Sequence, residues 1–156
     1  MNQRPTDPRN MMGVYRTLAD VPDRRRLHQH AAAYDGRDVW DEYLVEDVRE
    51  RVTGEHGRTM ARRVGRYWRE HMDERGRHHA LATPEDVETW SAALLDEYAE
   101  RTAYNYWRFV HFFYEYLRWH TDHPHTYTPA LMAAAEAPAT GEIWKVRNAF
   151  WRGDEE

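Results

Sequence analysis

Apolar residues recur at helical spacing along most of the chain, and the first two such stretches have contrasting polar faces. Over residues 38–52 the apolar positions recur every three to five residues beside an acidic face, which predicts an amphipathic helix. Over residues 58–75 the apolar side includes Val64 and Trp68, and the other positions are rich in arginine until Gly76 ends the pattern. The sequence therefore predicts an acidic helix followed by a basic one.

Two more helices are predicted from a cap and from a run of aromatic residues. Thr83-Pro84-Glu85-Asp86 combines a hydroxyl cap, a proline at the first helical position and acids in the first turn, where the helix dipole favours them. Residues 101–120 are dense in aromatic side chains on nearly every side of the predicted helix. Such a helix is packed by neighbours on most sides, so we expect it at the centre of the core.

The two ends of the chain differ from this middle part. Residues 1–12 lack an apolar period and predict a mobile arm, and a short helix is expected over 24–34. Pro129 can begin a short helix, and a small-residue linker after Pro138 leads to a last amphipathic segment. The expected organisation is an N-terminal arm at 1–35, a helical domain at 36–137, and a linker with a C-terminal segment at 138–156.

Composition narrows the class of protein. No alternating apolar run is long enough to indicate a sheet, so the expected fold class is all-α, a compact bundle of four to six helices. The 156 residues include no cysteine, which excludes disulfides, thiolate zinc sites and a cysteine nucleophile. No window approaches the ~18 to 20 apolar residues of a membrane span, and the N-terminus lacks the apolar stretch of a secretory signal. We therefore expect a cytoplasmic protein with no membrane partner.

Charge is distributed unevenly along the chain. The net charge of −5 argues mildly against nucleic acid as a partner. Residues 58–79, however, carry seven basic and three acidic side chains, whereas residues 80–100 carry six acidic and no basic ones. This alternation is compatible with one positive face on an otherwise negative body.

The order of these helices is similar to that of a known family. The shared elements are Thr59 with Val64 and Trp68 on the basic helix, the capped acidic helix from Thr83 to Val87, the aromatic helix after Thr102, and a proline turn at Pro129. Over residues 39–135 the chain resembles the N-terminal core-binding domain of tyrosine recombinases, the phage-integrase family, which has a sterile-alpha-motif-like fold. The resemblance implies that the second and fourth helices lie against the major groove of duplex DNA.

The implied DNA contacts fall on two helices. They are Arg58, Arg62, Arg63, Arg66 and Arg69 on the basic helix, and Thr102, Asn105, Arg108 and His111 on the aromatic helix. Helical spacing independently places Arg62, Arg66 and Arg69 on one face, where guanidinium groups can bind phosphate and guanine.

Both halves of this implied contact set have an ordinary structural alternative. The arginines could form a solvated face that pairs with neighbouring acids such as Glu46, Glu50 and Asp86. Asn105 and His111 could instead satisfy hydrogen bonds in the core or at a helix end.

The chain departs from the family where catalysis is concerned. A tyrosine recombinase needs a second domain with arginines, a lysine, histidines and a tyrosine nucleophile, and no His-x-x-Arg pair followed by a suitable tyrosine occurs after Pro129. We therefore expect no enzyme activity, no catalytic residues and no cofactor. The predicted function is a non-catalytic double-stranded DNA-binding module, site-specific or not, related to DNA integration and recombination or to the regulation of an intact integrase.

The main alternative is a helical interaction or oligomerisation scaffold that does not bind DNA. Aromatic residues are common interface anchors, and a homodimer is predicted through Ile143, Trp144, Phe150 and Trp151. The two functions differ in where the arginines point, because arginines consumed in ion pairs favour the scaffold. A metal site at the histidines of residues 120–125 is the weaker interpretation of that segment, and a solvated turn is expected there.

Overall fold

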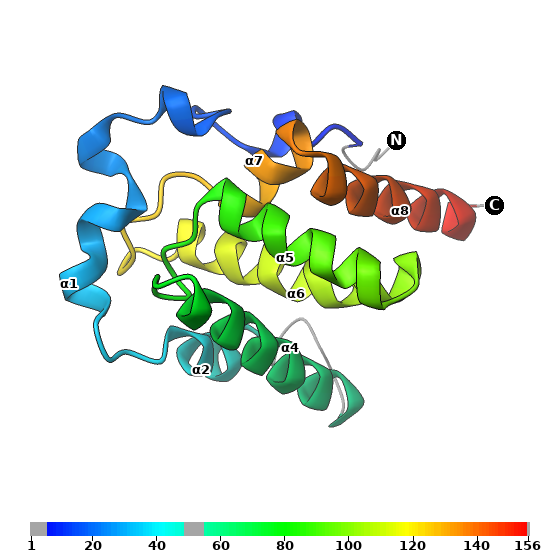
Figure 1. Ribbon diagram of the computed structural model, residues 1–156, viewed down its shortest axis with the longest axis horizontal. Coiled ribbons are helices and arrows are strands. Elements are labelled where there is room, and N and C mark those ends of the chain that lie inside the picture. Colours follow the sequence, from blue (N-terminus) through cyan, green and yellow to red (C-terminus); the bar gives the residue numbers. More distant parts are fainter. Residues whose placement is uncertain (1–5, 49–54, 156) are drawn as a thin grey trace.

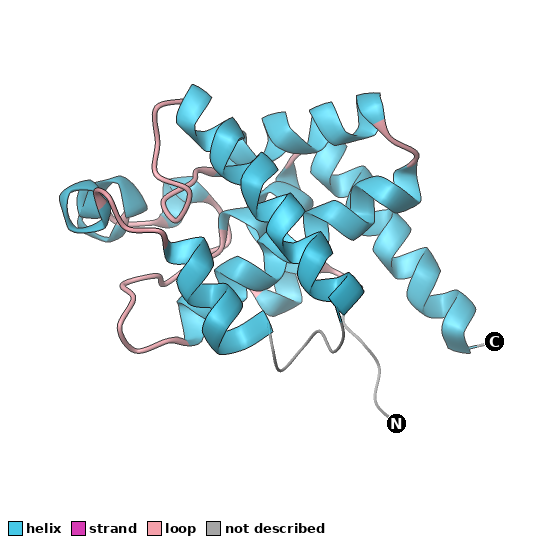
Figure 2. Ribbon diagram, turned by 90° about the horizontal axis from the view of Figure 1, so that it is seen from below, coloured by secondary structure: helices cyan, strands magenta, loops and turns pink. Residues whose placement is uncertain are grey.

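The computed structural model describes residues 6–48 and 55–155, and for residues 47, 48 and 150–155 it describes the backbone alone. The described residues form helices and loops without a strand, so the all-α prediction is confirmed (Figure 2). The described residues contain seven α-helices, where the sequence predicts four to six: α1 (Ala31–Tyr34), α2 (Val39–Tyr43), α4 (Glu55–Glu74), α5 (Pro84–Glu97), α6 (Glu100–Trp119), α7 (Pro129–Glu136) and α8 (Pro138–Glu155). Short 3₁₀ turns precede them at η1 (Pro8–Met11), η2 (Leu18–Asp20), η3 (Asp23–Arg25) and η4 (Leu27–His30), and α2 continues as a π-helical turn, η5 (Leu44–Val48).

Helix α6 is the centre of the core, as its aromatic residues predict. It contacts α2, α4, α5, α7 and α8, and it lies beside α5 between α8 on one side and α4 with α2 on the other (Figure 1). Its Trp107, Phe113 and Tyr114 side chains are fully buried. Burying each such ring stabilises the fold by roughly 1.5–3 kcal/mol, so α6 contributes a large share of the hydrophobic free energy of folding.

The junction between α4 and α5 is built on the predicted cap. Thr83 Oγ1 accepts a hydrogen bond from the Asp86 backbone N–H, and the Asp86 carboxylate accepts one from the Thr83 N–H. Asp86 also binds the guanidinium groups of Arg75 and Arg77. Burial alone would raise the pKa of Asp86, but the Thr83 N–H and the two arginines outweigh it and lower that pKa. The carboxylate therefore fixes the end of α4 to the start of α5.

The N-terminal segment is packed where the sequence predicts a mobile arm. Of residues 1–12, the structure describes 6–12, and among them Pro8 and Met12 are buried. The Thr6 carbonyl accepts hydrogen bonds from Trp144 Nε1 at 2.7 Å and from Asn148 Nδ2 at 2.9 Å, both on α8. Hydrogen bonds to α8 and burial on α7 and α8 hold these residues in place, although they have no apolar period of their own. The prediction of a mobile arm is therefore wrong for residues 6–12.

At the other end, α8 begins at Pro138 without a preceding linker. The Glu88 carboxylate of α5 accepts hydrogen bonds from the Ala139 and Thr140 N–H groups, both at 2.9 Å, and so caps the new helix from a distant part of the chain. A carboxylate at a helix N-terminus satisfies orphan donors and interacts favourably with the dipole. The sequence predicts a linker here because the capping residue is not local.

Docking of α8 also changes the expected dimer surface. Ile143 and Trp144 are buried inside the same chain, so the prediction that they anchor a homodimer is corrected for these two residues. Phe150 and Trp151, the other predicted anchors, have side chains outside the described part of the structure. None of the helices in the described ranges is both long and apolar enough to cross a bilayer.

Close contact between α2 and α4 depends on one glycine. Trp40 of α2 is fully buried, and its Nε1–H donates to the Ala61 carbonyl of α4 at 3.1 Å. A Cβ atom at Gly65 would lie 2.1 Å from Trp40 Nε1, far inside van der Waals contact. Only a residue without a side chain therefore allows the indole to lie on α4.

We predict that Gly65→Ala destabilises the protein by about 3 kcal/mol, because the indole ring must leave its site to accommodate one methyl group. Urea unfolding measures the change. Gly141→Ala on α8 is the matched control, since its Cβ would first meet the Ala134 carbonyl at an ordinary 3.4 Å. Equal stability of the two variants would contradict this account of the α2–α4 contact.

Candidate nucleic-acid interface

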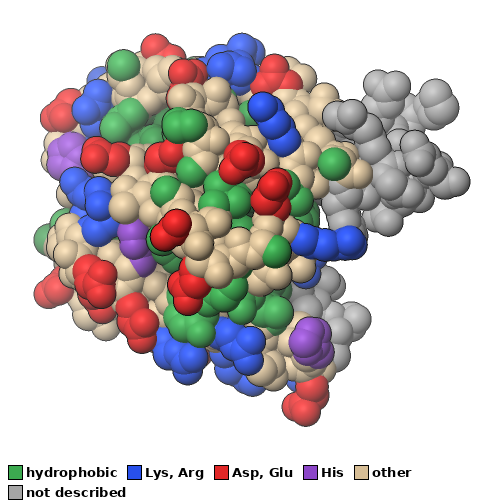
Figure 3. All heavy atoms as spheres, turned by 45° about the vertical axis from the view of Figure 1, so that its right-hand side comes forward, with side chains coloured by type: hydrophobic (Ala, Val, Ile, Leu, Met, Phe, Trp, Pro, Cys, Tyr) green, Lys and Arg blue, Asp and Glu red, His purple; other side chains and the backbone are tan. Residues whose placement is uncertain are grey.

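The described surface carries a hollow lined by arginines, which we call the arginine groove. Arg62, Arg63, Arg66 and Arg69 line it together with Thr59, all from α4, and its other wall is formed by Asp41 and Leu44. Its volume is about 490 Å³. Figure 3 shows Lys and Arg side chains gathered along the lower edge of the molecule, over α4. The groove thus brings together four of the five arginines that the sequence singled out on this helix.

The groove follows from the two faces of α4. Ala61, Val64, Trp68 and Met72 are buried on its inner face, and this burial turns the intervening arginines outward. Arg58, Arg62, Arg63 and Arg66 are exposed. Arg58 belongs to the same exposed set but does not line the groove.

Most of these arginines have no ion-pair partner among the described side chains. No ion pair there involves Arg58, Arg62, Arg63 or Arg66. Arg69 is the exception, because its Nη1 lies 2.7 Å from Asp38 Oδ2 and its Nε–H donates to the Gly65 carbonyl.

The acids named as alternative partners are engaged elsewhere or not described. Asp86 binds Arg75 and Arg77, and Glu46 accepts hydrogen bonds from Tyr116 and His120. Glu50 lies outside the described residues. Asp86 and Glu46 therefore do not neutralise the arginine face.

The residues expected on α6 do not join the arginine groove. Thr102, Asn105 and Arg108 are half-buried, and none of them lines it. The Arg108 guanidinium lies over the Phe109 ring, 5.3 Å from its centroid. Their roles in DNA contact stay predictions.

His111 requires a correction. Only 4% of it is exposed, and its ring stacks on Trp107 with centroids 5.3 Å apart and meets the edge of Trp144 at 6.0 Å. Helix α8 brings Trp144 over this side of α6, so His111 is part of the core and not of a DNA-facing surface. This burial agrees with the core position in the alternative given for His111 above, in which it satisfies a hydrogen bond in the core or at a helix end.

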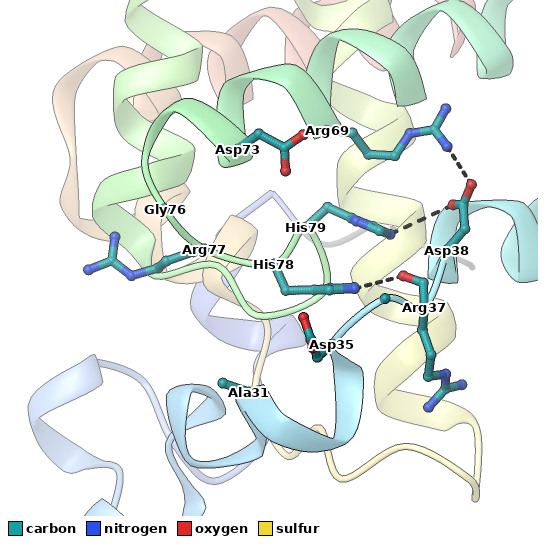
Figure 4. Close-up of a pocket in the computed structure, with 11 residues that line it drawn as sticks. Ala31, Asp35, Arg37, Asp38, Arg69, Asp73, Gly76, Arg77, His78 and His79 are labelled. Carbon is teal, nitrogen blue, oxygen red and sulfur yellow. Dashed lines mark hydrogen bonds and ion pairs between the residues drawn. The ribbon is translucent and has the colours of Figure 1, made fainter.

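A second hollow of about 550 Å³ lies beside the C-terminal end of α4. Arg69 and Asp38 line it, and Arg69 also lines the arginine groove. His79 points at Asp38, and His78 points at the Arg37 carbonyl (Figure 4). Each arginine that lines it is paired with a carboxylate: Arg69 holds Asp38, Arg37 holds Glu42, and Arg77 holds Asp86. Asp35 and Asp73 line it as well. Unlike the arginine groove, this hollow therefore presents no arginine without an ion pair among the residues that line it.

Sequence reasoning missed Asp38 and Asp41, which place α2 against the arginines. Asp38 Oδ1 caps α2 by accepting the Asp41 N–H at 3.1 Å, while its other oxygen holds Arg69. The sequence predicts the helix start at residue 38, and an Asp directly before an apolar period is a known cap signal that could also have identified Asp38 as the cap. The pairing with Arg69, 31 residues away, has no local signal.

The histidines do not form the solvated turn that the sequence predicts. His123 and His125 are buried: His123 Nδ1 lies 2.6 Å from the Tyr34 hydroxyl, and His125 Nε2 lies 2.7 Å from the Ala80 carbonyl. His79, also buried, accepts the Trp40 N–H on Nε2 at 3.1 Å. In the described part of the chain no three His, Asp or Glu side chains converge as metal ligands do.

Burial keeps these imidazoles neutral. It lowers the pKa of His79 to about 3, with a further decrease from His78 and Arg69 and a partial increase from Asp38. It lowers the pKa of His125 to about 4, against the opposing effect of the Ala80 carbonyl. Protonating either group in the folded protein would place a charge among apolar rings.

The chain matches no known protein family, no curated protein and no solved structure. Interpretation of the site therefore rests on its own geometry and charges.

We predict that stability falls as the pH falls below about 6.5, where the unfolded chain binds protons at His79 and His125 that the folded chain excludes. Each histidine with a lowered pKa contributes stability that is fully present above about pH 6.5. As the pH falls, this contribution decreases by up to about 1.4 kcal/mol per pH unit, and it levels off near the pKa of the folded state. Urea unfolding between pH 7 and 5 should therefore show a slope that His79→Gln reduces by roughly 1 kcal/mol per unit.

His28→Gln is the control for this measurement, because His28 is exposed and its replacement should leave the slope unchanged. A slope in His79→Gln equal to that of the unsubstituted protein would show that His79 is not the group responsible.

Proposed function

We propose that this chain is a non-catalytic module that binds double-stranded DNA through the arginine groove and the adjoining Arg58. The observation that carries the proposal is the set of exposed α4 arginines without ion pairs among the described acids, three of which line one groove with Arg69. Guanidinium groups displayed in a row on a helix match the spacing of phosphates and the donor requirements of guanine. A single surface of α4 therefore supplies both kinds of contact.

The dimensions and stiffness of α4 support a major-groove orientation. The helix spans twenty residues, and Trp68 and Val64 anchor its inner face in the core. The major groove of B-DNA, about 12 Å wide, admits one α-helix. The Arg66 guanidinium also lies over Tyr67, 5.5 Å from the ring centroid, which limits its freedom before binding.

The negative net charge is compatible with this proposal because electrostatic attraction is local. At physiological salt the Debye length is about 8 Å, so acids on the far side of the protein are largely screened from a duplex at α4. A body of net charge −5 would orient the molecule so that α4 faces the DNA.

The resemblance to the integrase core-binding domain points to the same helix. The basic second helix of that domain corresponds to α4. We therefore also propose a role in DNA integration or recombination, or in regulating an intact integrase. The interface proposed here differs from the one that the resemblance implies, since it depends on α4 and omits His111.

An interaction scaffold remains the second candidate, favoured by exposed large apolar residues. Val14 is 87%, Val45 is 53% and Trp119 is 75% exposed, and Trp119 lies at the end of α6. None of the three lines the arginine groove. A docking role for any of them is therefore compatible with DNA binding at α4.

We predict that Arg62→Ala and Arg66→Ala weaken duplex binding without reducing stability. If about four phosphates are contacted, the logarithm of the association constant falls with the logarithm of the salt concentration at a slope of about −3.6. Removing two of these contacts in the double variant should reduce the slope to about −1.8. Fluorescence anisotropy with a labelled duplex over a salt series measures both quantities. Lys145→Ala, an exposed change of the same charge on α8, is the control.

Two results would count against this function. Full affinity in the Arg62 and Arg66 double variant would remove the groove from the interface. Absence of any duplex binding at low salt, where phosphate contacts are strongest, would leave the scaffold as the better account.

A further inference from the structure

Among the described side chains, Asp41 is the one acid that lines the arginine groove. It is exposed, and it faces the groove together with Arg62, Arg63, Arg66 and Arg69. No ion pair joins its carboxylate to any of them within the described residues, although Asp38, three residues earlier, pairs with Arg69 at 2.7 Å. The Asp41 carboxylate is therefore an acceptor that the fold leaves without a described partner.

The position of Asp41 is fixed even though its carboxylate is not engaged. Its backbone N–H donates to Asp38 Oδ1 at 3.1 Å, and the preceding residue, Trp40, is locked between Gly65 and Phe113. Asp38 is held in turn by Arg69. The acceptor is thus held at a defined place beside the arginines, as a group that reads a ligand must be.

A carboxylate in this place is unsuited to a surface that binds only phosphate. It repels the phosphate backbone and lowers the positive potential of the groove. It suits a surface that also reads base edges, because the major-groove edge of a G·C pair presents guanine acceptors for arginine and the cytosine N4 amino donor for an acid. The mixed lining matches both halves of that pair.

We propose that Asp41 is a specificity-determining residue that accepts a hydrogen bond from the N4 amino group of a cytosine while a groove arginine binds guanine. This inference rests on the proposed DNA-binding function and adds its sequence preference: a duplex site containing a G·C pair opposite α2 and α4. Loss of the acceptor should relax selection at that one position, and loss of the negative charge should tighten binding to all duplexes.

The test is a binding selection from a pool of random-sequence duplex DNA, followed by sequencing. The unsubstituted protein should enrich sites with a fixed cytosine by roughly 5- to 100-fold over other bases at that position, the range of one good base contact. Asp41→Ala should enrich the same site with a several-fold weaker preference for cytosine at that position, because the arginine that binds the paired guanine remains, and should bind unselected duplexes several-fold more tightly.

Two further variants separate hydrogen bonding from charge and from folding. Asp96→Ala removes the same charge from an exposed position on α5 that does not line the groove, and it should retain the cytosine preference. Asp41→Asn removes the charge but keeps an acceptor oxygen and the side-chain shape, so it should show a preference between those of the alanine variant and the unsubstituted protein. Thermal unfolding of each variant identifies any that fails to fold.

The outcomes separate the role of Asp41 from the proposed DNA-binding function on which it rests. An equal preference for cytosine at that position in the unsubstituted protein and Asp41→Ala, with merely tighter binding, would overturn the role of Asp41 in reading bases. Binding of all duplexes without enrichment would overturn it as well and leave DNA binding intact. Failure to retain any duplex at low salt would remove the DNA-binding proposal itself.

Discussion

The packing of Trp40 on Gly65 is the contact on which the rest of the structure depends. The indole donates to Ala61 of α4, its backbone N–H donates to His79, and its ring lies 4.8 Å from that of Phe113 on α6. One residue, through its indole and its backbone N–H, therefore joins α2, α4, α6 and the segment that follows α4. Because a Cβ at Gly65 would overlap the indole, the approach of α2 to α4 depends on a residue with no side chain.

The segment between α4 and α5 shows how polar groups are satisfied around this contact. The His79 carbonyl accepts hydrogen bonds from Trp68 Nε1 at 2.9 Å and from the Tyr114 hydroxyl at 2.8 Å. Burying polar groups is tolerated when their hydrogen bonds are made, and these bonds also fix the geometry of the surrounding helices. Neutral histidines are used inside, whereas the arginines of α4 remain outside, so the fold separates its buried polar network from the charged surface proposed to bind DNA.

The helices of the middle part could be predicted because their signals are local. The basic helix, the Thr83 cap and the aromatic helix agree with α4, α5 and α6 to within a few residues. The packed N-terminal segment and the immediate start of α8 could not, since they depend on Trp144 donating to Thr6 and on Glu88 capping a helix some 50 residues away. Burial of His111 depends on the same docking of α8.

The sequence by itself determined that α4 has an apolar side and an arginine side, because a period of 3.6 residues assigns every side chain to a face without reference to any other element. Only the tertiary structure decided what those arginines meet. Asp38 is held by Arg69, Asp41 stands in the groove beside Arg62 and Arg66, and Asp86 turns away to Arg75 and Arg77. Ion pairs and groove walls join residues distant in sequence, and the packing of side chains such as Trp40 selects among the many pairings that charge alone would allow.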